Sequence, residues 1–201
     1  MGSRINPAER VKIIKENLDT SSARRGNDQT SSEQGKNMIV CGIDVGLLVC
    51  GYCICEVQNA KVHLMKEGEI KTTKKQEFPE KLEFIYEELH KEIENYRPSA
   101  IILEKLYSHH RHPTTLGILA QVRGVVVLLS RKSHTDLFEY APTRARKAFL
   151  GKGSANSLQV KKMAENFIGA DMKSLHTADA FSLVIAFAHE EKVRNLKMVV
   201  Q

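Results

Sequence analysis

The chain has 201 residues, of which 42% are hydrophobic, so it is long and apolar enough for one domain with a good-sized core. Its formal net charge of +6 at pH 7 mildly favours a polyanionic partner such as nucleic acid. No unbroken run of about 18 apolar residues is present, and no apolar signal-peptide core follows Met1. We therefore expect no membrane partner and a cytoplasmic location.

The first 37 residues are predicted to form an N-terminal extension, made of a short helix and a disordered linker. Residues 6–18 have the apolar spacing and the capping residues of an amphipathic helix. Residues 19–37 contain one alanine and otherwise only polar residues and glycine, which is typical of a linker. Met38 then directly begins a strand, so a second interpretation stays open, in which the reading frame is over-extended and Met38 is the true start.

The apolar pattern of residues 38–194 predicts a mixed α/β domain, followed by a C-terminal tail over residues 195–201. The expected strands are residues 38–44, 49–57, 61–72, 100–104 and 137–141. The expected helices are residues 78–96, 114–132, 142–150, 156–168 and 177–194. This order predicts a mixed sheet with helices on its faces. Residues 124–129 are apolar on nearly every side, which predicts cover by the sheet and by another subunit.

The four cysteines lie together in the first two predicted strands, at Cys41, Cys50, Cys53 and Cys55. A disulfide framework would spread them over the chain, so we expect reduced thiols. Cys50 and Cys53 have the spacing of a zinc-binding pair, but residues three apart on a strand point to opposite faces, and no second pair is present. We interpret these cysteines as small buried strand residues.

Two predicted strands end in a carboxylate, Asp44 and Glu104. In an open α/β sheet the chemistry collects at such strand ends, so the two carboxylates can lie side by side. His176 and Asp179 are three residues apart and share one face of a helix. Together these residues predict a site for Mg²⁺ or Mn²⁺, which would support phosphodiester hydrolysis. Each of the four also has an ordinary structural explanation, as a turn cap, a strand end or a helix-terminus residue.

Basic residues gather between residues 144 and 162, and a second group lies in the loop 108–113. The first group is Arg144, Arg146, Lys147, Lys152, Lys161 and Lys162, and the second is His109, His110, Arg111 and His112. Cations around a carboxylate site would bind phosphates and reduce their repulsion from the site. For any single lysine, a solvated surface charge is the ordinary alternative.

Five segments occur in the order and spacing of the RuvC family of bacterial Holliday junction resolvases. They are GIDVGLLVCGY, AIILEKLY, TLGILAQVRGVV, FEYAPTRARKAFLGKGSANSLQV and HTADAFSLVIAFAH. The resemblance runs from Met38 to about His189 and implies an RNase H-like fold, with a mixed five-stranded sheet and helices on both faces. It also implies a homodimer that nicks four-way junction DNA symmetrically during recombination and repair.

The resemblance carries further expectations about cofactors, partners and location. It implies two Mg²⁺ ions per subunit, with Mn²⁺ as a substitute. It adds a branch-migration helicase complex as a partner and a nucleoid-associated location. Residues 38–194 would then be the nuclease domain.

By the family pattern, Asp44, Glu104 and Asp179 match catalytic carboxylates, and His176 falls where members carry Asp or His as the fourth metal ligand. Tyr107 matches an aromatic residue that stacks at the junction crossover. The expected DNA-binding residues are Tyr107, Arg111, Arg146, Lys147, Lys152 and Lys161. The helix over residues 114–130 matches the region that packs the dimer.

The sequence departs from the family pattern at three positions. Val45 replaces the proline of an Asp-Pro-Gly turn. Arg146 stands where lysine is usual, which keeps a positive charge for phosphate contact. Ser157 stands where another lysine is usual and loses that charge, with Lys152 and Lys161 close enough to substitute.

Three alternatives stay open. A different RNase H-like nuclease, such as an RNA–DNA hybrid cleaver, would share the fold and the carboxylates. A non-catalytic junction-binding module would share the fold, although the intact carboxylates argue against it. An actin-like ATPase also begins with a strand, an Asp and a Gly, but it needs a later glycine-rich phosphate loop that this sequence lacks.

Overall fold

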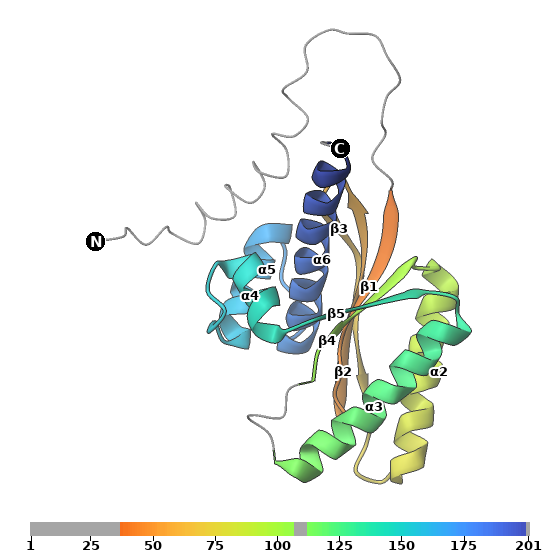
Figure 1. Cartoon of the computed structure of the whole chain (residues 1–201). Helices are drawn as coiled ribbons and strands as arrows, with labels where there is room; N and C mark the ends of the chain where they lie inside the picture. Colours follow the sequence, from red (N-terminus) through yellow and green to blue (C-terminus); the bar gives the residue numbers. More distant parts are fainter. Residues whose placement is uncertain (1–36, 107–111, 200–201) are drawn as a thin grey trace, which may run out of the picture.

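The computed structural model describes residues 37–106 and 112–199 (Figure 1), and for residues 192–199 it describes the backbone alone. The predicted helix over residues 6–18 therefore lies outside the described residues. The same holds for Tyr107 and Arg111, which we expect to contact DNA.

The helices and strands follow the predicted order. The strands are β1 (Met38–Asp44), β2 (Val49–Gln58), β3 (Lys61–Lys71), β4 (Ala100–Glu104) and β5 (Asp136–Tyr140). The helices are α2 (Phe78–Tyr96), α3 (Pro113–Lys132), α4 (Pro142–Leu150), α5 (Ser157–Ile168) and α6 (Leu175–Val199). The predicted end of the last helix at residue 194 is wrong, because α6 continues through residues that contain neither proline nor glycine.

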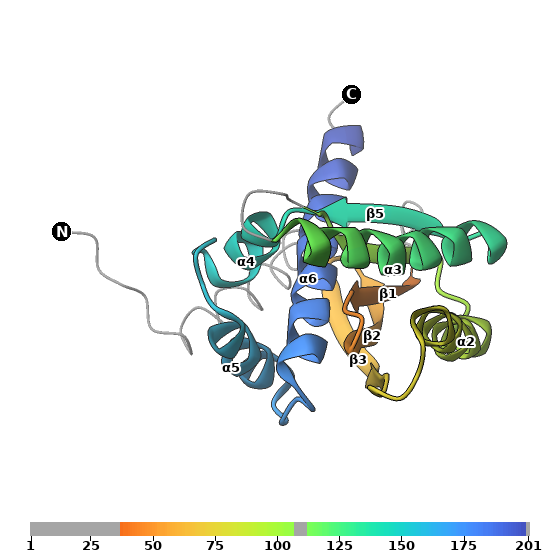
Figure 2. The same ribbon diagram turned by 90° about the horizontal axis from the view of Figure 1, so that it is seen from below.

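The strands form one mixed sheet in the order β3-β2-β1-β4-β5. Strand β2 pairs antiparallel with both β1 and β3, whereas β4 pairs parallel with both β1 and β5. Helices α2 and α3 lie on one face, and α4, α5 and α6 lie on the other (Figures 1 and 2). The expected mixed sheet with helices on both faces is therefore confirmed.

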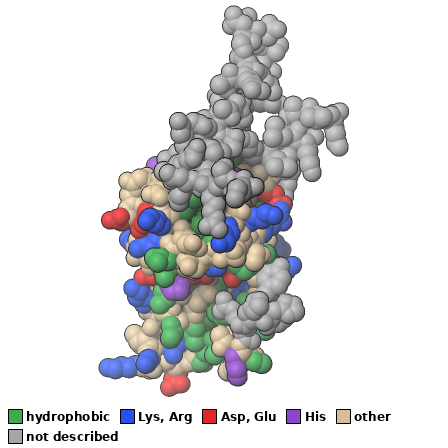
Figure 3. All heavy atoms as spheres, turned by 90° about the vertical axis from the view of Figure 1, so that its left-hand side faces the viewer, with side chains coloured by type: hydrophobic (Ala, Val, Ile, Leu, Met, Phe, Trp, Pro, Cys, Tyr) green, Lys and Arg blue, Asp and Glu red, His purple; other side chains and the backbone are tan. Residues whose placement is uncertain are grey.

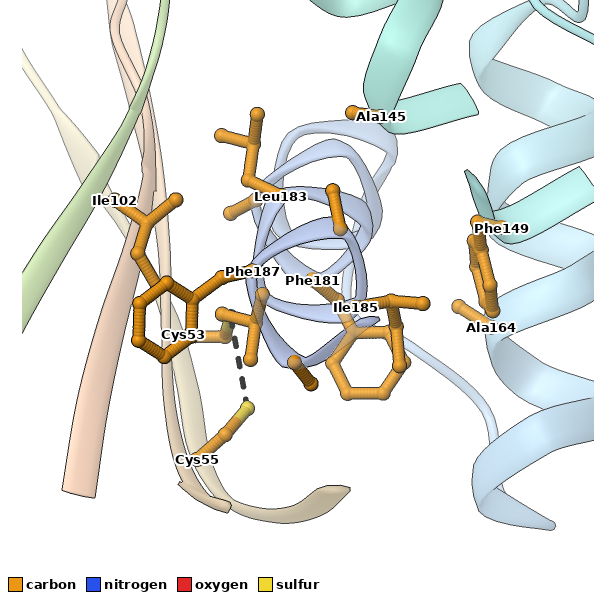
Figure 4. Packing of buried hydrophobic residues seen from close by; sticks show 14 of the residues in the cluster. Cys53, Cys55, Ile102, Ala145, Phe149, Ala164, Phe181, Leu183, Ile185 and Phe187 are labelled. Atoms are coloured by element: carbon orange, nitrogen blue, oxygen red, sulfur yellow. Dashed lines mark hydrogen bonds between the residues drawn. The ribbon is translucent and has the colours of Figure 1, made fainter. Parts of the chain in front are cut away.

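Helix α6 lies directly on the sheet, with α4 and α5 on its outer side (Figure 4). Its buried aromatic side chains face both ways: Phe187 packs edge-on to Phe138 of β5 at 5.0 Å, and Phe181 packs edge-on to Phe149 of α4 at 5.9 Å. The close approach requires glycine at position 42, because a Cβ there would collide with the backbone carbonyl oxygen of Ala180. This contact places the N-terminal end of α6 beside the ends of β1 and β2.

All four cysteines are fully buried free thiols, as predicted. Cys53 and Cys55 face α6, whereas Cys41 and Cys50 belong to the cluster beneath α2 and α3. Cys50 and Cys53 therefore point to opposite faces of the sheet. Their role within the described structure is packing.

Helix α3 is the one helix among the described residues that is long and apolar enough to cross a membrane by length and composition. Counting unbroken apolar runs in the sequence does not reveal it, because polar residues such as Arg123 interrupt the run. In the structure Val122 and Val126 are fully buried in the core, and Arg123 forms an ion pair with Glu139 of β5. One side of helix α3 therefore packs onto the sheet.

Candidate active site

The ends of β1 and β4 bring two carboxylates to the same edge of the sheet. Ile43 lies opposite Leu103 in the parallel pair, and the next residue of each strand is Asp44 or Glu104. Because side chains alternate along a strand, both carboxylates point toward the face that α6 covers. The predicted placement of these two residues at neighbouring strand ends agrees with the structure.

Helix α6 brings His176 to Asp44. The His176 Nδ1 atom lies 2.8 Å from Asp44 Oδ2. Gly51 of β2, which is opposite Asp44, makes this possible, because a Cβ there would lie 2.5 Å from the His176 carbonyl carbon. Ser174 stabilises the start of α6, since its Oγ accepts a hydrogen bond from the Thr177 amide at 3.1 Å.

One turn further along α6, Asp179 is held by residues of α4 and α5. Its Oδ2 accepts a hydrogen bond from the Ser157 hydroxyl at 2.6 Å. Its Oδ1 lies 3.5 Å from Arg146 Nη2, which is an ion-pair distance, but this oxygen is buried and accepts no hydrogen bond from the described residues. One oxygen of Asp179 is thus fixed, and the other keeps its lone pairs.

Burial and the neighbouring groups of the site shift the pKa values of His176 and Asp179. The hydrogen bond to Asp44 raises the pKa of His176, and the charges of Asp44, Glu69 and Asp179 add to this effect while burial opposes it. Burial raises the pKa of Asp179, and the charge of Asp44 adds to it, whereas Ser157, Arg146 and His176 act in the opposite direction. The raised pKa of His176 reflects the negative charge of the carboxylates around it.

Glu69 of β3 adds to this charge. It lies opposite Gly51, which in turn lies opposite Asp44, so the three residues form one row across the sheet. Its carboxylate forms an ion pair with Lys71 at 2.7 Å, and its charge acts on His176. Glu69 was not among the predicted site residues, because alternation within β3 does not reveal which residue of β2 lies opposite.

The four predicted site residues suit a hard divalent cation, since Asp44, Glu104 and Asp179 are carboxylates and His176 is an imidazole. The buried Oδ1 of Asp179 offers a lone pair that no described residue uses. Over the part of the chain that the structure describes, no three His, Cys, Asp or Glu side chains gather closely enough to hold a metal ion. Asp44 is instead paired with His176, and Asp179 with Ser157.

The predicted DNA-binding residues differ in how they face the solvent. Lys147 and Lys152 are exposed, whereas Lys161 is half-buried and forms an ion pair with Glu165 at 3.5 Å. Arg146 is turned inward, and its Nη1 donates to the carbonyl oxygen of Ala155 at 2.9 Å. On the face that carries α4 and α5, Figure 3 shows lysine and arginine side chains interspersed with acidic and histidine side chains.

A mixed five-stranded sheet with carboxylates at the ends of β1 and β4, and a third on the helix that covers them, defines the class of RNase H-like nucleases. The family model described as crossover junction endodeoxyribonuclease RuvC matches residues 40–189, which is well over half of the chain. The chain therefore belongs to the RuvC family of crossover junction endodeoxyribonucleases, as its sequence motifs indicate.

Individual relatives agree with this assignment. The crossover junction endodeoxyribonuclease RuvC of Brachyspira hyodysenteriae is 32% identical over 158 residues, which cover 79% of this chain and 98% of that protein. The RuvC of Alkaliphilus metalliredigens is 31% identical over 161 residues, with coverage of 79% and 98%.

Solved structures confirm the fold. Thermus thermophilus RuvC superposes with a TM-score of 0.67 at 21% identity and covers 78% of this chain and 96% of its own. The T. thermophilus RuvC in complex with a Holliday junction substrate gives a TM-score of 0.69 at 20% identity, with the same coverage. The expected RNase H-like fold is thus confirmed.

The contact between His176 and Asp44 predicts the titration of His176 in metal-free protein. Its pKa should lie above the ordinary 6.5, because the protonated ring binds the Asp44 carboxylate. The stabilisation of the folded protein by this ion pair is therefore complete below pH 6.5. It is lost as pH rises through the raised pKa of His176. NMR titration of the histidine ring protons should show this value, and Asp44→Asn should lower it. An unchanged His176 pKa in that variant would contradict the contact.

Proposed function

We propose that this protein is a structure-selective DNA endonuclease that resolves Holliday junctions by symmetric, Mg²⁺-dependent hydrolysis of phosphodiester bonds during recombination and repair. The observation that carries the proposal is the family match over residues 40–189, which includes all four proposed ligands. These are Asp44, Glu104, His176 and Asp179, and the register of β1 and β4 together with the close packing of α6 supports their assignment.

The four residues would hold two Mg²⁺ ions per subunit, with Mn²⁺ as a substitute. When bound, such ions supply a polarised attacking water and stabilise charge on the leaving oxygen. The protein's own part is to orient the ligands. Ser157 fixes one oxygen of Asp179, Gly51 leaves room for His176, and the row from Glu69 to Asp44 keeps the site negative.

The DNA would be held by its phosphates. Lys147 is exposed on α4, Lys152 is exposed just after that helix, and Lys161 lies on helix α5. Such cations offset the repulsion between the acidic site and the DNA backbone, and their contribution falls as salt rises. Tyr107, Arg111 and Arg146 are the other residues expected to bind DNA.

We extend the proposal to a homodimer built on α3. Residues 124–129 of this helix are apolar on nearly every side, yet only 28% of the helix's apolar stretch is buried. Leu128 is 53% exposed, and a Cβ added at Gly117 or Gly124 would meet open space. A second copy related by a twofold axis would cover this apolar face and present two sites for matched nicks.

The family membership supports three further parts of the proposal. A branch-migration helicase complex is the proposed functional partner, and the cytoplasmic nucleoid is the proposed location. Residues 1–37 are proposed to be an extension outside the catalytic unit.

A nicking assay on a synthetic four-way junction tests the proposed activity. With Mg²⁺ we expect paired nicks in opposite strands, and with a chelator none. Asp179→Asn should lower the nicking rate by more than about 100-fold, because it removes a ligand charge, and should leave junction affinity nearly unchanged. A linear RNA–DNA hybrid is the control substrate, and equal cutting of hybrid and junction would contradict the proposal.

Leu128→Glu tests the proposed dimer. A buried unpaired carboxylate costs roughly 3 kcal/mol or more, which is about 100-fold or more in Kd. We expect light scattering after size exclusion to give a dimer for the wild type and a monomer for this variant. Leu158→Glu is the matched control, because Leu158 is 67% exposed on α5, and it should remain a dimer. If the wild type and Leu128→Glu are both dimers, the interface lies elsewhere.

A further inference from the structure

Ser157 and Arg146 meet Asp179 where α4, α5 and α6 come together. Ser157 is the first residue of α5, directly after the N-cap Asn156, so its position is fixed by the helix start. Its hydroxyl donates to Asp179 Oδ2 at 2.6 Å, the length of a charge-assisted O–H···O⁻ hydrogen bond. Serine is short, and this contact leaves its only proton committed to Asp179.

Arg146 supports Ser157 from the other side. Its Nη1 donates at 2.9 Å to the carbonyl oxygen of Ala155, a residue that is almost completely buried. Its Nη2 donates at 3.4 Å to the Ser157 oxygen, which directs the serine proton toward Asp179. The same Nη2 lies 3.5 Å from Asp179 Oδ1, close enough for attraction but too far for a short hydrogen bond.

This geometry differs from the role expected for position 146. A phosphate contact needs an outward-facing guanidinium, but the Arg146 side chain is 24% exposed and is held at Ala155. To reach DNA it would have to break that hydrogen bond and leave Ser157. Nearby Lys147 and Lys152 are exposed and need no such change to bind phosphate.

Ser157 and Arg146 also oppose the effect of burial on the pKa of Asp179. Burial disfavours the charged carboxylate, whereas the Ser157 hydroxyl and the Arg146 charge favour it. The ionised form is the one that binds a divalent cation. The hydrogen bond occupies Oδ2 alone, so Oδ1 stays available.

We infer that Ser157 and Arg146 are positioning residues for Asp179: Ser157 fixes Oδ2, Arg146 orients Ser157, and Oδ1 is directed to the divalent cation. The inference rests on the proposed function in one respect, the role of Asp179 as a metal ligand. It also accounts for serine at position 157, where lysine is usual in the family. The Ser157 hydroxyl and the neighbouring Arg146 guanidinium together provide a proton donor and a positive charge there.

The test measures Mn²⁺ binding and junction binding separately on the full chain. Isothermal titration with Mn²⁺ should show an affinity that falls roughly 10- to 100-fold in Ser157→Ala, the usual loss when a metal ligand loses its hydrogen-bond partner. The Mg²⁺ concentration for half-maximal nicking should rise in parallel. Ser157→Thr, which keeps the hydroxyl, should restore both values. Junction affinity without metal should change by less than about threefold, because no phosphate contact is lost.

Two controls separate positioning from DNA contact. Ser154→Ala removes an exposed serine three residues earlier and should change neither affinity. Lys152→Ala should weaken junction binding and leave Mn²⁺ affinity unchanged. If Ser157→Ala behaves like Lys152→Ala, or like Ser154→Ala, the inference is overturned.

A second variant guards against misfolding. Arg146→Gln removes the positive charge next to Ser157 and should also weaken Mn²⁺ binding, so it carries the test if Ser157→Ala does not fold. Unchanged Mn²⁺ affinity in a folded Arg146→Gln would overturn the role of Arg146. If the wild type binds Mn²⁺ but does not nick junctions, the proposed function fails while the Mn²⁺ comparison still decides this inference.

Discussion

The site depends on the close packing of α6 against β1 and β2. Helix backbone can approach strand backbone this closely only where the strands lack side chains, and Gly42 and Gly51 provide the two gaps. Gly42 admits the helix at Ala180, and Gly51 admits it at His176. If a side chain stood at either place, α6 would have to move outward, and the 2.8 Å contact between His176 and Asp44 would be lost. The arrangement of the proposed ligands is thus a consequence of helix-on-sheet packing.

A second constraint is electrostatic. Several carboxylates meet at one partly buried edge of the sheet, where their repulsion is weakly screened. The structure offsets this repulsion locally, with His176 against Asp44, Ser157 and Arg146 against Asp179, and Lys71 against Glu69. A divalent cation would replace part of this compensation. The proposed DNA-binding lysines outside the site would extend the positive potential toward the DNA backbone.

Patterns within single segments predicted much of this protein. Alternation and helical periodicity placed the described strands and helices to within two residues, apart from the end of α6. Asp44 and Glu104 were recognisable because each ends an apolar strand, and neighbouring parallel strands bring such ends together. The end of α6 was harder to predict, because no proline or glycine marks it.

The sequence by itself determined the order of strands and helices along the chain, the burial of the cysteines and the identity of the strand-end carboxylates. These properties follow from local periodicity and from the types of residue. Only the tertiary structure decided that Glu69 lies in one row with Asp44, and that Arg146 turns inward to Ser157. The physical reason is that strand register and the packing of helix on helix join residues far apart in the chain, and a local pattern carries no information on which of them meet.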